Sequence, residues 1–302
     1  MTPTHQGSIR LFQLAGIEVF LHWSWFLVAL YEIQQRAGRY ASPVWNVLEY
    51  LGLFAIVLLH EFGHSLACRQ VGGRADRIVL WPLGGVAYVQ PPERPGATLW
   101  SIAAGPLVNV ILIPVFLLLG RLMSVYGVLE TRPDLVYWLA DIARVNLVLL
   151  IFNLLPVYPL DGGQILRALL WFPLGRARSL IVAAVLGLVG VCALGLLALA
   201  GRSVWIGIMA AFILLNCWGG LRHGLHLARM ARAQRRAGLS CPACQAQPPV
   251  GAFWVCGHCQ GSFDLFETQA VCPQCGAAYA SAPCLACGRS SPMGEWGPSS
   301  RP

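Results

Sequence analysis

Residues 45–67 read WNVLEYLGLFAIVLLHEFGHSLA, an apolar run that is long enough to cross a bilayer. Inside it, His60-Glu61-Phe62-Gly63-His64 has the pattern H-E-x-x-H. On a helix, His60 and His64 lie one turn apart on the same face, so both imidazoles can bind one zinc ion and Glu61 can act as general base on zinc-bound water. Ionisable groups are costly in a membrane segment, which favours a functional interpretation. The stretch predicts a protease site within a membrane helix.

The composition supports a membrane protein. Hydrophobic residues make up 57% of the 302 residues and charged residues only 11%, whereas soluble domains carry roughly 25% charged residues. We therefore expect an all-α polytopic membrane protein with about six transmembrane helices. The first candidate is the weakest because it contains His22 and Glu32, and we interpret it as a retained membrane segment rather than a signal peptide. The six candidates are 17–33, 45–67, 99–123, 136–157, 180–200 and 204–221.

Arginine predicts the orientation of these spans, because the chain has no lysine and its net charge of +8 rests on arginine alone. If the N-terminus is cytoplasmic and six helices follow, most arginines fall on the cytoplasmic side, including the cluster at 222–236. This asymmetry obeys the positive-inside rule. We therefore expect a multi-pass protein of the cell membrane with both termini in the cytoplasm. The outer side would receive Arg36, Arg39, Arg121, Arg132 and Arg202.

A catalytic zinc needs a third protein ligand, and Asp161 is the best candidate. It lies in the segment 153–163, NLLPVYPLDGG, where the fourth apolar run ends. Two prolines and two glycines break the helix there, and irregular backbone at membrane depth is tolerated only beside a cavity or inside the protein. The alternative is an ordinary Asp-Gly turn, but the zinc motif favours a ligand. Asp141 is a weaker candidate because Arg144, one turn along, can pair with it.

With these motifs, the chain resembles the site-2 protease family of intramembrane zinc metalloproteases, peptidase family M50. The resemblance rests on 60–64 and 153–163, on AGPLVN at 104–109 and on WPLGGV at 81–86. It covers about residues 9 to 221 and is similar to the compact bacterial branch that includes sporulation-type members. The short loops contain no PDZ-like insertion, and no pair of CBS modules follows the helices.

The resemblance implies a zinc metalloendopeptidase that cuts membrane-protein substrates in or near a transmembrane segment, as in regulated intramembrane proteolysis. His60, His64 and Asp161 would bind the catalytic zinc, and Glu61 would activate its water. Asn153 would face the substrate backbone or the oxyanion. From the residues alone, Asn153 could equally form an interhelical hydrogen bond.

A hairpin is predicted between the second and third long helices. Residues 78–89 read as two β-rich halves around the turn Gly84-Gly85. A transmembrane helix must unwind before it is cut, and a strand edge can pair with the extended peptide. We expect this hairpin to bind substrate through such an edge, with Pro82 limiting pairing on its own side. The alternative is a structural loop.

The C-terminal part is predicted to be a small zinc-ribbon β domain. Four Cys-x-x-Cys pairs have the spacing of zinc knuckles, and a cytoplasmic location argues against disulfides. Sequential pairing would give a double zinc ribbon with two structural zinc ions, although interleaved pairing is also open. We expect domains at 1–221 and 240–289, a basic juxtamembrane linker at 222–239 and a disordered tail at 290–302. The cysteines are Cys241, Cys244, Cys256, Cys259, Cys272, Cys275, Cys284 and Cys287.

The ribbons have few charges of their own, which argues against nucleic acid as partner and favours recruitment of substrate or of a cytoplasmic regulator. The main alternative function is a polytopic zinc transporter or metal-sensing membrane scaffold without protease activity. That alternative explains His60, His64 and the cysteines, but it explains neither Glu61 nor the segment 153–163.

Overall fold

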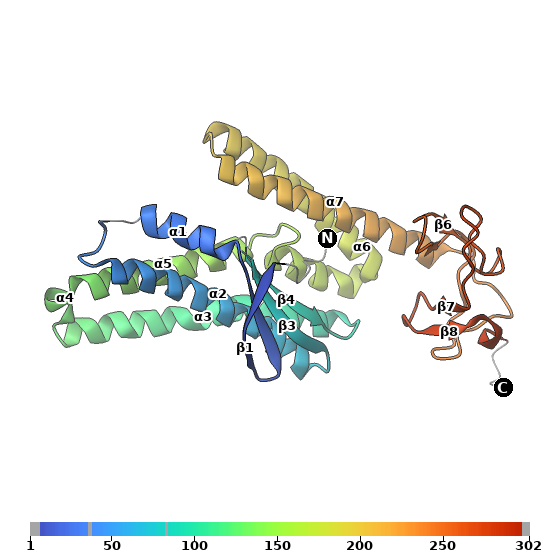
Figure 1. The fold of residues 1–302 in the computed structure, drawn as a ribbon, viewed down its shortest axis with the longest axis horizontal. Helices are drawn as coiled ribbons and strands as arrows, with labels where there is room; N and C mark the ends of the chain where they lie inside the picture. Colours follow the sequence, from blue (N-terminus) through green and yellow to red (C-terminus); the bar gives the residue numbers. More distant parts are fainter. Residues whose placement is uncertain (1–6, 36–37, 82–83, 298–302) are drawn as a thin grey trace. The chain divides into compact units, whose positions relative to one another are not determined.

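The computed structural model describes residues 7–35, 38–81 and 84–297, and the chain forms two compact units, Met1–Arg222 and His223–Pro302. The first unit combines long helices with one sheet (Figure 1). Its elements are β1 (Ser8–Leu14), β2 (Ile17–His22), α1 (Trp25–Gln35), α2 (Pro43–Gln70), β3 (Arg74–Trp81), β4 (Gly84–Gln90), α3 (Pro95–Val125), α4 (Val128–Thr131), α5 (Pro133–Asn153), α6 (Asp161–Ala200) and α7 (Val204–Arg232).

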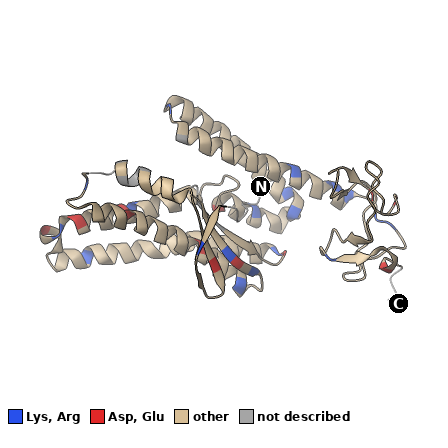
Figure 2. Ribbon diagram, in the orientation of Figure 1, with Lys and Arg blue, Asp and Glu red and all other residues tan. Residues whose placement is uncertain are grey.

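Five helices of the described residues, namely α2, α3, α5, α6 and α7, are long and apolar enough to cross a membrane. Their middle portions carry few charges, and the charged residues gather at helix ends and on the strands (Figure 2). The prediction of a first transmembrane helix at 17–33 is wrong. That stretch forms β2 and the 11-residue α1, because Ile17 and Val19 are fully buried on one face of a strand that pairs with β3.

The strand β2 and α1 nevertheless run beside α2. The backbone oxygen of Gly16 accepts a hydrogen bond from Arg69, near the end of α2, at 2.9 Å. Tyr50, in the first half of α2, donates to the backbone oxygen of Trp25 at 2.9 Å. The chain from Gly16 to Trp25 therefore runs along α2 in the opposite direction.

The sheet has the order β1-β2-β3-β4, and β4 is an edge strand. Strand β1 is antiparallel to β2, β2 is parallel to β3, and β3 is antiparallel to β4. Ile78 and Leu80 of β3 are fully buried and pack with Val57 and Phe62 of α2. The predicted hairpin is thus present as β3 and β4, within a larger sheet. Pro82 and Leu83 lie outside the described residues.

Asp141 of α5 holds the segment that precedes α2. Its carboxylate accepts two hydrogen bonds from Arg39, both at 2.8 Å, and one from Tyr40 at 3.2 Å. Arg144 also pairs with it at 3.0 Å, as the sequence indicated. Only 3% of Asp141 is exposed, so these partners balance a carboxylate that is otherwise removed from water.

Helix α6 is broken at Gly175, whose φ of 76° and ψ of 170° are not helical. The first part, 161–174, carries Asp161, and the second part contains the predicted span 180–200. Arg176, just after the break, forms an ion pair with Glu93, just before α3. The break therefore lies at the same end of the bundle as the start of α3.

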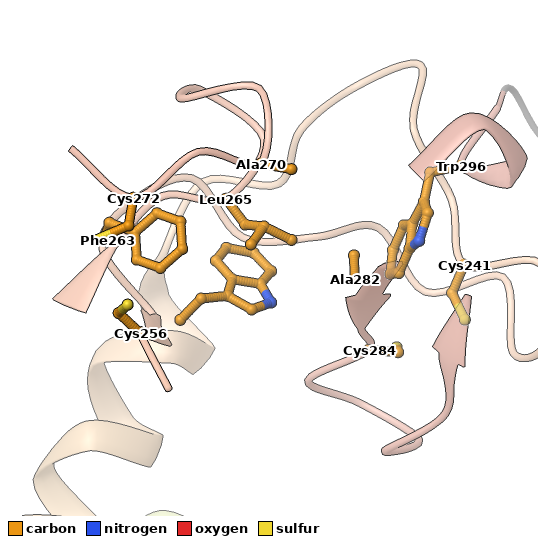
Figure 3. Close-up of a cluster of buried hydrophobic side chains, with 10 residues drawn as sticks. Cys241, Cys256, Phe263, Leu265, Ala270, Cys272, Ala282, Cys284 and Trp296 are labelled. Carbon is orange, nitrogen blue, oxygen red and sulfur yellow. The ribbon is translucent and has the colours of Figure 1, made fainter. Parts of the chain in front are cut away.

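The second unit is built from short two-stranded sheets: β5 (Trp254–Val255) with β6 (Ser262–Phe263), and β7 (Ser281–Pro283) with β8 (Ser290–Pro292). Figure 3 shows Phe263 near Cys256 and Cys272, Trp296 and Ala282 near Cys241 and Cys284, and Leu265 between the two sides. The small core thus extends from one group of cysteines to the other.

Two boundaries differ from the expected ones. The basic stretch after residue 221 continues α7 as helix to Arg232. Residues 290–296, expected to be disordered, form β8 and the 3-10 helix Met293–Glu295. Trp296 is only 4% exposed and belongs to the core. The serine, proline and glycine content of this tail is typical of disorder, but Trp296 attaches it to the core.

Candidate metal centre and active site

Three predicted ligands come together in the first unit. His60 and His64 project from α2, and Asp161 is the first residue of α6. The His60 Nε2 atom lies 3.1 Å from His64 Nε2 and 3.0 Å from Asp161 Oδ2. The distance from His64 Nε2 to Asp161 Oδ2 is 3.4 Å. Their potential ligand atoms all lie within 4.8 Å of one another.

The other ring nitrogens determine the tautomers of the two histidines. His60 Nδ1 lies 2.6 Å from Asn109 Oδ1, and His64 Nδ1 lies 2.9 Å from the backbone oxygen of Ser101. Asn109 Nδ2 donates to Asn146 Oδ1 at 2.8 Å, which leaves its oxygen to face the imidazole. Both Nδ1 atoms therefore donate, and in the neutral rings both Nε2 atoms are left as acceptors.

This arrangement fits a bound cation. Two bare Nε2 atoms and a carboxylate oxygen face one another, and the buried Asp161 Oδ2 has no hydrogen-bond donor among the described residues. Three acceptors at such distances repel unless a positive charge lies between them. With zinc–ligand distances of about 2.0–2.1 Å, tetrahedral ligands are about 3.3 Å apart. The observed 3.0–3.4 Å separations match that value.

Helix α3 comes close enough to enclose the histidines because it has glycine at position 105. A Cβ atom there would lie 2.3 Å from His64 Nε2 and 2.9 Å from His60 Nε2. Both contacts are shorter than van der Waals distance, so any side chain at this position would displace the imidazoles. The AGPLVN segment thus leaves room for the centre with Gly105 and orients His60 with Asn109.

Glu61 lies beneath β4. Its Oε2 accepts a hydrogen bond from the backbone nitrogen of Ala87 at 3.0 Å. A Cβ atom on Gly85 would lie 2.3 Å from Glu61 Cγ, so only glycine allows this approach. Because β4 pairs with β3 alone, the N–H of Ala87 that reaches Glu61 lies on the free edge of the sheet. The centre is therefore bordered by an edge strand of the sheet.

Of the other residues predicted to bind substrate, Asn153 lies beside His60, and Gly84 lies at the end of the hairpin. Asn153, the last residue of α5, places its Nδ2 atom 3.5 Å from His60 Nε2. Gly84 pairs with Trp81 at the end of the hairpin. Three residues at the centre were not predicted to act there: Ser101, Asn109 and Asn146. Asn109 and Asn146 are fully buried, and such amides inside apolar helices are the sequence signal that could have identified them.

The eight ribbon cysteines form two groups of four. Cys241 and Cys244 join Cys284 and Cys287, while the two central pairs join each other. The first pair thus combines with the fourth and the second with the third, so the pairing is nested, and neither sequential nor interleaved. Sulfur–sulfur distances of 3.5–3.9 Å match the edges of a zinc tetrahedron with bonds of about 2.3 Å.

The inner group of cysteines, formed by Cys256, Cys259, Cys272 and Cys275, accepts a hydrogen bond from a side-chain hydroxyl. The hydroxyl of Tyr279 donates to Cys256 Sγ at 3.0 Å, and the backbone nitrogen of Gly257 donates to the Tyr279 oxygen at 2.8 Å. This hydroxyl and the nearby backbone N–H groups lower the pKa of Cys256 to about 5. The thiolate, which is the form that binds zinc, is thereby favoured.

Comparison with known proteins gives a consistent result. Residues 49–136 and 133–197 match Peptidase family M50. A zinc metalloprotease of Methanocaldococcus jannaschii is 36% identical over 184 residues, which cover 60% of this chain and 50% of the relative. Stage IV sporulation protein FB of Bacillus subtilis is 33% identical over 118 residues, 38% of each chain. The chain thus spans half or less of the length of these curated relatives.

The structure of the site-2 protease from Methanocaldococcus jannaschii superposes with a TM-score of 0.52 at 30% identity, covering 71% of this chain and 95% of that one. The superposed share of that protein is nearly complete, and the residues that match Peptidase family M50 include His60, His64 and Asp161. The chain therefore belongs to the site-2 protease family, peptidase family M50.

Proposed function

We propose that the protein is an intramembrane zinc metalloprotease that hydrolyses peptide bonds in or near transmembrane segments of membrane proteins. One observation carries this proposal: three buried acceptors converge in the membrane unit, and Glu61 lies next to His60 on the same helix. His60, His64 and Asp161 would hold the catalytic zinc. Bound zinc would supply Lewis-acid activation of water and of the scissile carbonyl.

The chain's own residues perform the remaining steps. Glu61 accepts a proton from the attacking water and returns it to the leaving amine. Ala87 orients the Glu61 carboxylate through its backbone N–H. Asn109 and Ser101 keep the imidazoles turned toward Asp161. Asn153, with its amide beside His60, can donate a hydrogen bond to the substrate carbonyl.

The free edge of β4 would bind the unwound substrate. Its outward N–H at Ala87 reaches Glu61, so a peptide added at this edge would run past the centre. Gly85 leaves room for Glu61 to approach the strand, because a Cβ atom there would lie 2.3 Å from Glu61 Cγ. This supports a substrate-binding role for the hairpin.

The two four-cysteine groups would hold two structural zinc ions, which give a total of three sites with the catalytic one. The unit contains too small a core to fold without them, so the metal would supply folding energy. We propose a protease domain to about residue 221, a ribbon domain from about 240, and placement in the compact bacterial, sporulation-type branch. The similarity to the Bacillus sporulation protein supports the last assignment.

Both termini would face the cytoplasm. Arginines gather at the end of the bundle where α2 ends, α3 begins and α6 is broken, including Arg69, Arg94 and Arg176. We infer that β2 and α1, beside α2, would complete a sixth crossing in addition to the five long helices, so that the chain would cross an even number of times before the ribbon unit. The positive-inside rule then orients this end toward the cytoplasm.

A zinc transporter is not favoured. A transport path needs ligands at several depths, but His60, His64 and Asp161 are the one metal-ligand group among the described residues of the membrane unit.

Comparing membrane proteomes of cells that make wild type, Glu61→Gln or Glu49→Gln tests the proposal. Glu49 is a matched control on the same helix. Single-pass proteins should accumulate with Glu61→Gln alone, while all three proteins retain zinc. Equal proteomes for wild type and Glu61→Gln would refute a protease function.

A further inference from the structure

The ribbon unit contains a cavity that neither zinc group explains. Its volume is about 100 Å³, and apolar groups line most of it. Trp254 and Trp296 are each 4% exposed, and Pro248 and Pro249 are buried as well. Met230 completes the apolar wall. An apolar cavity of about 150 Å³ holds a benzene ring, so the volume here suits one aliphatic side chain.

An unpaired cation borders this cavity. The Arg235 guanidinium donates to the backbone oxygens of Gln247 at 3.3 Å and Met230 at 3.4 Å, which fixes its position. No carboxylate pairs with it within residues 223–297, the described part of this unit. Its neighbour Arg236, by contrast, pairs with Asp264 at 2.7 Å. A guanidinium has five N–H donors, so Arg235 can still bind a carboxylate.

Trp296, one of the residues that line the cavity, has a buried donor. Within the described residues, Trp296 Nε1 has no hydrogen-bond partner, although the side chain is buried. The corresponding nitrogen of Trp254 donates to the backbone oxygen of Pro283 at 3.1 Å. Buried N–H groups are rarely left unpaired. An acceptor supplied by a ligand would satisfy the Trp296 indole.

We propose that this cavity binds a short linear segment of another polypeptide, in which an aliphatic residue lies beside an aspartate or glutamate. The aliphatic side chain fills the apolar cavity, the carboxylate pairs with Arg235, and a backbone carbonyl accepts from Trp296. A lipid with an anionic headgroup matches Arg235 equally well, but its acyl chain far exceeds the cavity. No residue of the histidine centre lines the cavity, and peptide binding does not depend on proteolysis.

Selection of phage-displayed random dodecapeptides on the full-length, zinc-loaded protein in neutral-lipid nanodiscs tests this proposal. Enriched sequences should combine Leu, Ile or Val with an adjacent Asp or Glu. The affinity of the best peptide is then measured by fluorescence anisotropy. Arg235→Gln should weaken binding about tenfold, since a charged hydrogen bond is lost, and Trp296→Phe should weaken it several-fold. Arg232→Gln, at the end of α7 but outside the cavity, should bind as wild type does.

Unchanged zinc content in each variant shows that the ribbons remain folded. Three results would overturn the proposal: no enriched motif, enrichment of basic or purely apolar peptides, or equal affinity for wild type, Arg235→Gln and Trp296→Phe. Complete loss of peptide binding when phosphatidylglycerol is added to the nanodiscs would instead identify a lipid-headgroup site, and would also overturn it.

Discussion

Replacing Asn109 with alanine should weaken zinc binding at the histidine centre without removing any ligand. Asn109 is fully buried, and its Oδ1 atom, 2.6 Å from His60 Nδ1, fixes the tautomer that leaves Nε2 free. Without it, His60 can rotate or adopt the other tautomer. Loss of such a partner typically costs 10- to 100-fold in metal affinity, which corresponds to about 1.4–2.8 kcal/mol.

The structure also predicts a second effect of this substitution. Asn146 pairs with Asn109 through two hydrogen bonds, of 2.8 and 2.9 Å, and would lose the one to the side chain. A buried group left unpaired costs about 1–3 kcal/mol of stability. Asn109→Asp is the matched control, because a carboxylate keeps an acceptor for His60. Its zinc affinity should exceed that of the alanine variant.

Chelator competition on the purified protein measures this affinity, with thermal unfolding recorded in parallel. Zinc held by the ribbons serves as an internal reference, since it should not change. If Asn109→Ala bound the third zinc within twofold of wild type, the inferred tautomer control of His60 would be incorrect.

Three further predictions concern other contacts. Gly105→Ala should abolish zinc binding at the histidine centre but not in the ribbons, because its Cβ would lie 2.3 Å from His64 Nε2; zinc analysis showing three ions per chain would contradict this. Tyr279→Phe removes the donor to Cys256 and should weaken the inner ribbon site about tenfold, whereas a chelator titration unchanged from wild type would argue against that role. Arg39→Leu should destabilise the membrane unit by about 1–2 kcal/mol, less than a fully buried pair because Arg39 is half-exposed. The unfolding temperature in detergent reports this, with exposed Arg121→Leu as control, and equal temperatures for the two variants would oppose it.

The grouping of His60, His64 and Asp161 could be predicted because its basis is local. H-E-x-x-H places two candidate ligands and a candidate base by helical spacing alone, and the proline- and glycine-rich segment around Asp161 is unusual at membrane depth. The strand pairing was harder to predict, because the apolar stretch at 17–33 suits a buried strand as well as a helix. Only its pairing with β3, some 60 residues away, decides between them.

Contacts between distant residues could not be predicted in the same way. Cys-x-x-Cys spacing does not specify which pairs share a metal, and the nested arrangement depends on how the β-strands fold back. The hydrogen bond from His60 to Asn109 links α2 with α3, and no spacing within the sequence specifies this contact. Trp296 lay in a tail whose polar composition outweighed one aromatic residue in the prediction.

The zinc content of wild type and Asp161→Ala, measured together with cleavage of a reconstituted single-pass substrate, tests the central claim most directly. We expect three zinc ions and cleavage for wild type, from one histidine–aspartate centre and two cysteine groups. Asp161→Ala should hold two zinc ions and leave the substrate intact. An Asp161→Ala protein that retains three zinc ions and still cleaves would contradict the proposed centre.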